Sequence, residues 1–237
     1  MKEALFVSRC PDIKEFSLVS LLIFLSRSKE YFRVKINVLP IAQYREPILE
    51  SVAKNNATIV VAETGAGKST QVPQYLMEAG YDVVVTQPRR LAARSLAERV
   101  AEESGYKLGD VVGYQTSQER IMSDNTRCLF VTDGLQLVND LMGRTVRNDS
   151  RVLIIDELHE WNLNIEVLVA WTRKQIRENP SFKVVLMSAT MEAERISAFF
   201  DGAPIFNVPG RLFPVDVQEP SNELIGDVAD LIIKGRN

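Results

Sequence analysis

The stretch TIVVAETGAGKST, residues 58–70, determines the fold that this sequence predicts. Its first half is a short apolar run typical of a buried strand, and its second half has the glycine and lysine spacing of a phosphate-binding loop. Gly65 and Gly67 allow backbone N–H groups to turn inward around phosphate oxygens, and the following helix adds the positive end of its dipole. Lys68 can place its ammonium on the β- and γ-phosphates, and the Ser69 hydroxyl can bind Mg²⁺.

One residue departs from the strict motif. Glycine is expected six residues before the lysine, and this chain has Ala62 there. The departure is small, because the GxGK[ST] part is intact. A glycine-rich turn without a ligand is the alternative, but strand, loop and helix signals together favour the phosphate loop.

Four more short apolar runs follow along the chain. They are DVVVTQ (82–87), CLFVTD (128–133), VLIIDE (152–157) and VVLMSA (184–189). Helix-like segments lie between them, such as 90–105, which ends at Gly105, and 161–180, which stops at Pro180. The alternation predicts one α/β domain with a mostly parallel sheet flanked by helices on both faces, and functional residues are expected at the carboxyl ends of its strands.

Composition and charge limit the class of protein. The chain has 237 residues, of which 46% are hydrophobic and 25% charged, as in an ordinary soluble globular protein with one domain and part of another. Its net charge of −3 counts weakly against a nucleic-acid partner, because a few local arginines can suffice. Cys10 and Cys128 have no disulfide or metal spacing and fit a reducing compartment. The apolar stretch 17–26 is shorter than the about 20 residues that span a bilayer and is a poor signal peptide, so we expect a buried helix and a cytoplasmic protein without a membrane partner.

The stretch VLIIDELH, residues 152–159, places two carboxylates directly after a predicted strand. Asp156 is suited to holding the hydrated Mg²⁺ of a nucleotide bound to the loop, and Glu157 is the natural general base for the attacking water, or the group that positions it. Solvated charges at a strand end are the alternative. The apolar residues before them and the phosphate loop upstream favour the catalytic interpretation.

His159 is the only histidine in the chain. A zinc-protease motif would need a second histidine where Leu163 stands, and the cysteines lack ligand spacing, so the sequence disfavours a zinc site. A general-base role is redundant beside Glu157. A structural, hydrogen-bonded histidine and a mechanical coupler both stay open.

In their order along the chain, AETGAGKST, TQPRRLAA, TDG, DELH and SAT resemble the first RecA-like domain of the DEAH-box helicases. The resemblance runs from about Leu39 to Val217, and Leu158 stands where the family has alanine. It implies a RecA-like P-loop NTPase that uses ATP or another NTP with Mg²⁺ to remodel or unwind single-stranded RNA partners, less commonly DNA. It divides the chain into an unassigned extension (1–38), the first RecA-like domain (39–208), and a linker with the truncated start of a second domain (209–237). A second RecA-like domain would then be the missing partner, and this chain alone would hydrolyse nucleotide slowly.

The resemblance also implies roles for single residues on the nucleotide side. Ser69, Asp156 and Glu157 would organise Mg²⁺ and the attacking water. Arg99 would stack on the nucleotide base, consistent with the preference of a planar guanidinium for π-faces. The residues that it implies for nucleotide binding in the loop are Ala62, Glu63, Thr64, Gly65, Ala66, Gly67, Lys68, Ser69 and Thr70.

On the nucleic-acid side, the resemblance implies contacts from Arg89, Arg90 and Thr132 to the backbone of the bound strand. Ser188 and Thr190, together with His159, would relay hydrolysis to strand movement. One departure is Ser117, where the family commonly has an arginine that touches nucleic acid, and Arg120 is the candidate to compensate.

Two other classes of function remain as alternatives to a helicase domain. The first is a non-motor P-loop NTPase, acting as a switch or a kinase-like enzyme, against which TQPRR and TDG argue. The second is a non-catalytic interaction fragment, which would bind no nucleotide. The arginines from Arg89 to Arg99 could also be an ordinary solvated helix face.

Overall fold

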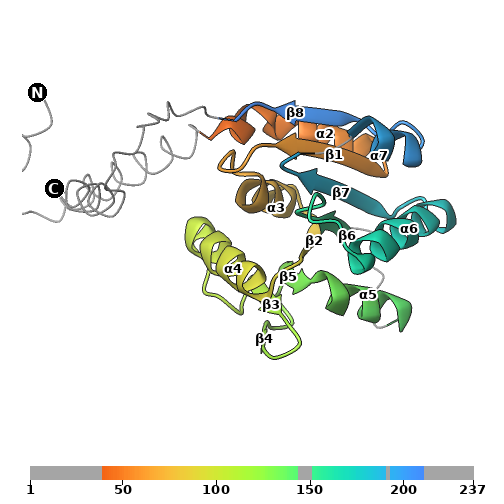
Figure 1. Cartoon of the computed structure of the whole chain (residues 1–237). Helices are drawn as coiled ribbons and strands as arrows, with labels where there is room; N and C mark the ends of the chain where they lie inside the picture. Colours follow the sequence, from red (N-terminus) through yellow and green to blue (C-terminus); the bar gives the residue numbers. More distant parts are fainter. Residues whose placement is uncertain (1–38, 144–150, 191–192, 211–237) are drawn as a thin grey trace, which may run out of the picture.

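A mostly parallel sheet with helices on both faces forms the part of the chain that the structure, a computed structural model, describes: residues 39–143, 151–190 and 193–210 (Figure 1). The strands are β1 (Ala57–Ala62), β2 (Asp82–Gln87), β3 (Val112–Gln115), β4 (Arg120–Ile121), β5 (Cys128–Thr132), β6 (Arg151–Ile155), β7 (Lys183–Ser188) and β8 (Ile205–Val208). The helices are the 3-10 helix η2 (Pro40–Tyr44) and the α-helices α2 (Arg45–Lys54), α3 (Lys68–Glu78), α4 (Arg90–Ser104), α5 (Asp133–Leu141), α6 (Leu163–Glu178) and α7 (Ala193–Phe199).

The strand order places the chain's early and late strands side by side. Within the described residues, eight strands pair in the order β4-β3-β5-β2-β6-β7-β1-β8, and every pair is parallel except β3 with β4. The chain leaves β1, forms β2 three strands away, and later returns to insert β6 and β7 between them. The α/β fold predicted from the sequence, a mostly parallel sheet flanked by helices, is therefore confirmed.

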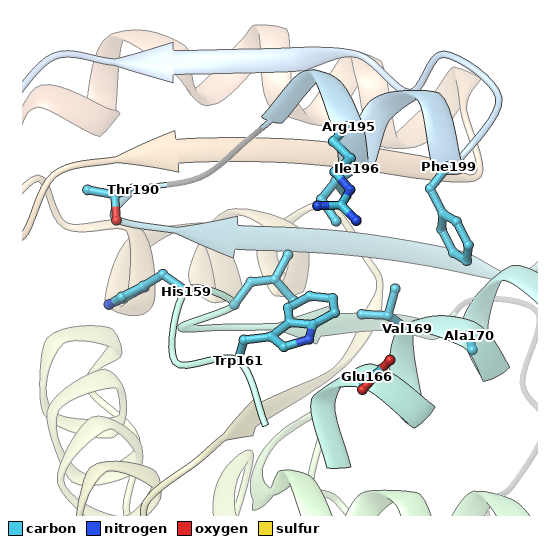
Figure 2. Close-up of a pocket in the computed structure, with 10 residues that line it drawn as sticks. His159, Trp161, Glu166, Val169, Ala170, Thr190, Arg195, Ile196 and Phe199 are labelled. Atoms are coloured by element: carbon cyan, nitrogen blue, oxygen red, sulfur yellow. The ribbon is translucent and has the colours of Figure 1, made fainter. Parts of the chain in front are cut away.

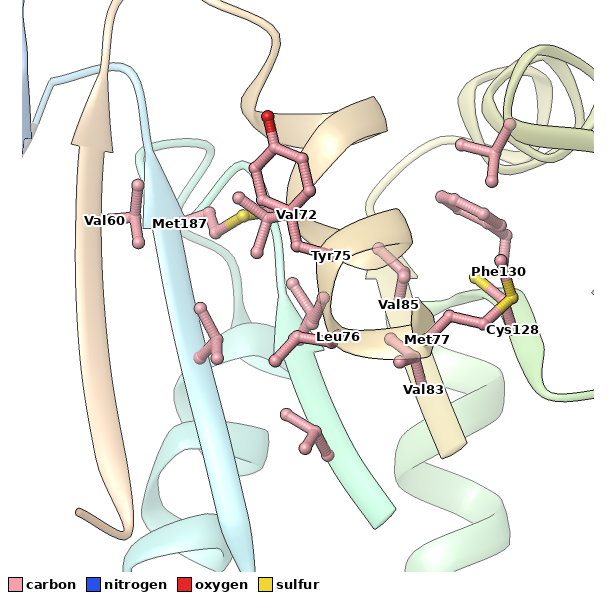
Figure 3. Close-up of a cluster of buried hydrophobic side chains, with 14 of the residues drawn as sticks. Val60, Val72, Tyr75, Leu76, Met77, Val83, Val85, Cys128, Phe130 and Met187 are labelled. Atoms are coloured by element: carbon pink, nitrogen blue, oxygen red, sulfur yellow. The ribbon is translucent and has the colours of Figure 1, made fainter. Parts of the chain in front are cut away.

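Neighbouring residues on the central strands face opposite sides of the sheet, and both sides are buried. On β1, Val60 belongs to the core under α3 and α4, whereas Ile59 belongs to the core under α6 and α7. Figure 3 shows Val72 and Leu76 of α3 directed at the strands, with Met187 of β7 nearby. Burial of each such side chain stabilises the fold by about 1.5–3 kcal/mol, which is why the strands read as continuous apolar runs rather than alternating ones.

Two helix boundaries have a local cause. The predicted helix 161–180 begins later, at Leu163, because the side chain of Asn162 accepts hydrogen bonds from the N–H groups of Asn164 at 2.9 Å and Ile165 at 3.2 Å and so acts as the N-cap. The predicted helix 90–105 ends as expected, since Gly105 adopts φ 73°, a left-handed C-cap conformation that glycine reaches without strain.

The registers bring the carboxyl ends of β1, β2, β6 and β7 to one edge of the sheet. Val61 pairs with Ser188, and Thr86 pairs with Ile155, so the segments that follow these strands start at nearly the same level. The phosphate loop, the DELH stretch and the SAT stretch all begin there. This edge is the place where a parallel sheet presents its functional loops.

Some expectations fall on other parts of the chain. The extension 1–38 with its apolar stretch 17–26, residues 211–237 of the expected linker and second domain, and Cys10 lie outside the described residues. In the described ranges, no helix is both long enough and apolar enough to cross a membrane.

Candidate active site

The phosphate loop lies between β1 and α3 and is supported from behind. Gly65 and Gly67 have φ values of 85° and 92°, which other residues adopt only with strain. A Cβ at Gly67 would lie 2.9 Å from Cδ1 of Leu39, the end of a flexible side chain that would have to shift, so the backbone conformation is the main reason for glycine there. The N–H of Ile41 donates to the carbonyl of Ala66 at 3.2 Å, which joins η2 to the loop. The loop is thus joined to η2, and its two glycines supply the left-handed backbone that its turn needs.

The loop residues named from the sequence divide into buried and open ones. Ala62 ends β1 and is packed in the core, so the methyl group that replaces the motif's glycine lies under the loop. Glu63, Thr64 and Gly65 are exposed at the turn. Thr70 donates from its hydroxyl to the carbonyl of Gly67 at 3.4 Å, within the first turn of α3. The exposed turn is the part that a phosphate could reach.

Lys68 meets both carboxylates of the DELH stretch. Its Nζ lies 3.0 Å from Oε1 of Glu157 and 4.0 Å from Oδ1 of Asp156, and its side chain is only 6% exposed. These residues are almost ninety positions apart in sequence. The structure therefore brings together the three side chains that the sequence predicted for phosphate, metal and water.

Asp156 is fully buried, and both of its oxygens accept hydrogen bonds. Gln87 donates from Nε2 to Oδ2 at 2.6 Å, and the N–H of Glu157 donates to Oδ1 at 2.8 Å. Burial raises the pKa of Asp156 above its ordinary value, the Lys68 ammonium opposes this, and the charge of Glu157 adds to it. The charge of this carboxylate is therefore poorly solvated, and a nearby cation would stabilise it. The sequence alone predicts no role for Gln87 of TQPRR. A polar side chain at the end of a buried strand is the sequence feature that could have indicated this contact with Asp156.

The oxygen donors present fit Mg²⁺. Ser69 contributes a hydroxyl, and Asp156 and Glu157 contribute carboxylates. The described residues contain no group of three or more His, Cys, Asp or Glu side chains able to hold a metal alone. Mg²⁺ commonly binds through one or two carboxylates plus substrate phosphates, which is the arrangement that this donor set allows.

Glu157 has an unusual backbone conformation. Its φ of 54° is left-handed, which costs a non-glycine residue about 1–2 kcal/mol. The N–H of Glu160 donates to the carbonyl of Glu157 at 2.8 Å and closes the turn. This turn directs the Glu157 carboxylate back towards Lys68 and the phosphate loop. Strain of this kind is common where a side chain has to be aimed.

His159, the last residue of the DELH stretch, lies between Glu157 and the end of β7. Its Nδ1 is 3.5 Å from the N–H of Ala189 and 3.4 Å from Oε2 of Glu157. The first contact needs an unprotonated Nδ1 as acceptor, and the second needs a protonated one, so the two exclude each other. Ser188 is buried and donates from Oγ to the carbonyl of Thr190 at 2.7 Å, while Thr190 is exposed. The three residues predicted as a relay thus lie together.

A separate cavity opens beside this histidine. It has a volume of about 810 Å³ and lies between α6, α7 and the loop after β6 (Figure 2). His159 and Thr190 are at one end, and Phe199 and Ala170 are at the other. No residue of the phosphate loop lines it, so it is distinct from the Lys68 site.

The residues predicted to contact nucleic acid lie along the same edge. Arg89 pairs with Glu160 through two contacts, Nη2 to Oε1 at 2.9 Å and Nε to Oε2 at 3.3 Å, and Arg90 beside it is exposed. Thr132 precedes α5 and is half-buried. Its neighbour Asp133 accepts a hydrogen bond from Asn162 at 3.2 Å, which joins the TDG stretch to the start of α6. Glu160 and Asn162 were given no role from sequence, since their partners are 71 and 29 residues away.

Arg99 lies on α4. Its Nε donates to Oε1 of Glu103 at 2.5 Å, and this bond raises the pKa of Arg99 above its ordinary value. Ser117 and Arg120, where the sequence departs from the resemblance, are both exposed around the β3–β4 turn.

A comparison with known protein families agrees with this geometry. The family model of the DEAD/DEAH box helicases matches residues 43–199, which is more than half of the chain. The matched region contains the phosphate loop, the Asp156–Glu157 pair and the SAT stretch. Domains of this family are nucleic-acid-dependent NTPases that generally use ATP with Mg²⁺. The chain therefore belongs to the DEAD/DEAH box helicase family.

Proposed function

We propose that this chain is the first RecA-like domain of a DEAH-box helicase, and that it hydrolyses ATP or another NTP with Mg²⁺ to remodel or unwind RNA. The observation that carries the proposal is the convergence of Lys68 with Asp156 and Glu157 at the carboxyl edge of a parallel sheet. Family membership supports the coarser activity, and the DELH, TQPRR and TDG stretches support the DEAH assignment.

In this mechanism the phosphates of the nucleotide replace Glu157 as the partner of Lys68. Backbone N–H groups of the loop and the N-terminus of α3 receive the phosphates, and Lys68 exchanges its bond to Glu157 for one to a phosphate oxygen. Ser69 and Asp156 would hold Mg²⁺, which when bound offsets phosphate charge. Released from Lys68, the Glu157 carboxylate can accept a proton from the attacking water.

His159 provides the coupling step. With a hydrogen on Nδ1 the imidazole can donate to Glu157, and without one Nδ1 accepts from the N–H of Ala189 after β7. A change at Glu157 on hydrolysis can therefore pass through His159 to the SAT stretch. Ser188 and Thr190 carry that change towards the bound strand.

RNA is the proposed polymer, with DNA as the alternative. Arg89 and Arg90 begin α4 as exposed cations, and Thr132 lies at the end of β5, two strands from β6 in the sheet. Cations of this kind contact phosphates regardless of base sequence. A second RecA-like domain is the proposed partner that completes the nucleotide site, and the cytoplasm is the proposed location.

The test is hydrolysis of ATP measured with no polymer, with poly-U and with poly-dT. The proposal expects acceleration by poly-U that exceeds any acceleration by poly-dT, and binding of the polymer that depends on nucleotide. A non-motor P-loop NTPase would bind and hydrolyse ATP with the same rate in all three conditions, and that result would replace this proposal.

A further inference from the structure

The carboxylate of Glu103 joins the helix after the phosphate loop to the helix that carries Arg99. Its Oε2 accepts hydrogen bonds from Nε2 of Gln71 at 2.8 Å and Nε2 of Gln74 at 2.9 Å, both on α3. Its Oε1 accepts from Nε of Arg99 at 2.5 Å, on α4. The Glu103 side chain is only 9% exposed. One nearly buried carboxylate thus accepts from three side chains on two helices.

The α3 end of this network reaches the phosphate loop. Gln71 is buried in the first turn of α3, and its N–H donates to the carbonyl of Gly67 at 2.9 Å. Its Nε2 also lies 3.5 Å from Oγ1 of Thr70. On the other side, Ser104 donates from Oγ to Oε1 of Gln74 at 3.2 Å, which fixes the second glutamine as well. The position of Glu103 is therefore set by the helix that starts at the loop.

A second ion pair on α4 shows what an ordinary pair looks like there. Arg94 and Glu98 have the same i, i+4 spacing and a similar length, 2.8 Å, but their side chains are 50% and 47% exposed. Exposed pairs of this kind contribute little to stability or geometry. In the Arg99–Glu103 pair, by contrast, the Glu103 side chain is 9% exposed and the Arg99 side chain is 60% exposed, so the carboxylate is nearly buried while the guanidinium faces solvent.

We propose that Glu103 is a positioning residue that holds the guanidinium of Arg99 at a fixed distance from the phosphate loop, ready to stack on the base of a bound nucleotide. The proposal rests on the proposed function, which supplies the nucleotide, and on the base-stacking role that the resemblance to DEAH-box helicases implies for Arg99. The tether uses Nε, at the edge of the guanidinium, and leaves its planar face open.

The test compares ATP with inorganic tripolyphosphate, both with Mg²⁺, because only ATP has a base. In Glu103→Gln we expect the affinity for ATP to fall roughly 3- to 10-fold, the scale of one cation–π contact, while the affinity for tripolyphosphate is unchanged. The matched control Glu98→Gln should change the affinity for neither ATP nor tripolyphosphate. In an Arg99→Ala background, Glu103→Gln should have no further effect on ATP, because the two residues act as one unit.

Each of the other possible results would overturn the proposal. Equal losses for ATP and tripolyphosphate, or additive losses in the double variant, would mean that Glu103 only supports the fold and would overturn the proposal. A wild-type protein that binds ATP no better than tripolyphosphate would overturn it too, while leaving the phosphate site intact. A wild-type protein that binds neither ligand would overturn the proposed function, and the proposal with it.

A measurement on the wild-type protein guards against a variant that fails to fold. The Nε–H proton of Arg99 should exchange with solvent more slowly than that of Arg94 in NMR spectra, and ATP but not tripolyphosphate should shift its resonance. Equal exchange of the two protons, or equal shifts with both ligands, would contradict the tether.

Discussion

The ammonium of Lys68 lies 3.0 Å from Oε1 of Glu157, so the side chain proposed to bind phosphate and the proposed base form an ion pair with each other. Lys68 and Asp156 are both nearly buried, which makes the three charges interdependent. Under the proposed function, a nucleotide takes Lys68 from Glu157 and in doing so frees the carboxylate, so binding and activation of the proposed base would be one event.

Lys68→Ala is expected to abolish tight nucleotide binding, because the phosphates lose a buried ammonium. It also leaves Asp156 and Glu157 without their shared cation, so we expect the free energy of unfolding to fall by about 1–3 kcal/mol. Adding Glu157→Gln removes the repulsion and should recover most of the stability, while nucleotide binding stays lost. Denaturant unfolding and titration calorimetry measure the two effects, and an unchanged ATP affinity in Lys68→Ala would refute the site assignment.

In a protein that includes the second RecA-like domain, His159→Ala should leave basal ATP hydrolysis within a few fold of wild type and weaken its stimulation by RNA. The imidazole contacts the N–H of Ala189 and one oxygen of Glu157, but Glu157 keeps Lys68 and its own turn without it. The measurement is hydrolysis with and without poly-U in wild type, His159→Ala and the control Glu166→Gln, an exposed residue of α6. A His159 variant as inactive as one lacking Glu157 would contradict the coupling role.

The ion pair between Arg89 and Glu160 predicts opposite effects of its two partners on RNA binding. Arg89→Ala should weaken binding across all sequences and reduce the slope of log affinity against log salt by about 1, the loss of one phosphate contact. Glu160→Gln should strengthen binding, because it releases Arg89 from its carboxylate. Fluorescence anisotropy at several KCl concentrations tests both, with Arg177→Ala on α6 as the control. Equal salt slopes for Arg89→Ala and Arg177→Ala would remove Arg89 from the interface.

Cys128 should be unreactive in the folded protein. Its thiol is fully buried, and burial raises its pKa from 9.0 to about 12. Since the folded pKa is the higher one, burial of the thiol does not weaken the fold below pH 9 and destabilises it as the pH rises towards 12. In a Cys10→Ser variant at pH 8, maleimide should label Cys128 only after denaturant unfolds the protein. Fast labelling without denaturant would show that β5 is accessible.

The strands could be predicted from sequence where both faces are buried, and not elsewhere. β1, β2, β5, β6 and β7 are continuous apolar runs because helices cover both sides of the sheet. The two edge strands have no such signal, since β4 has two exposed residues and β8 is only partly buried, and β3 beside β4 is short and contains a glycine. At an edge, pairing depends on the neighbouring strand more than on composition.

The same limit applies to the site. Lys68, Asp156 and Glu157 follow from local spacing, because a phosphate loop and a strand end each have their own pattern. Gln87 on Asp156, Glu160 on Arg89 and the αL turn at Glu157 come from tertiary contacts over about 70 residues or from backbone geometry. A single sequence holds no local signal for such partners.

The most direct test of the central claim is single-turnover ATP hydrolysis by Glu157→Gln beside wild type. The account predicts that Mg-ATP binds to the variant at least as tightly, because Lys68 no longer has a charged internal partner, and that hydrolysis slows by roughly 10² or more, because the base is lost. Hydrolysis at the wild-type rate with unchanged affinity would contradict both the base assignment and the exchange of Lys68 between Glu157 and phosphate.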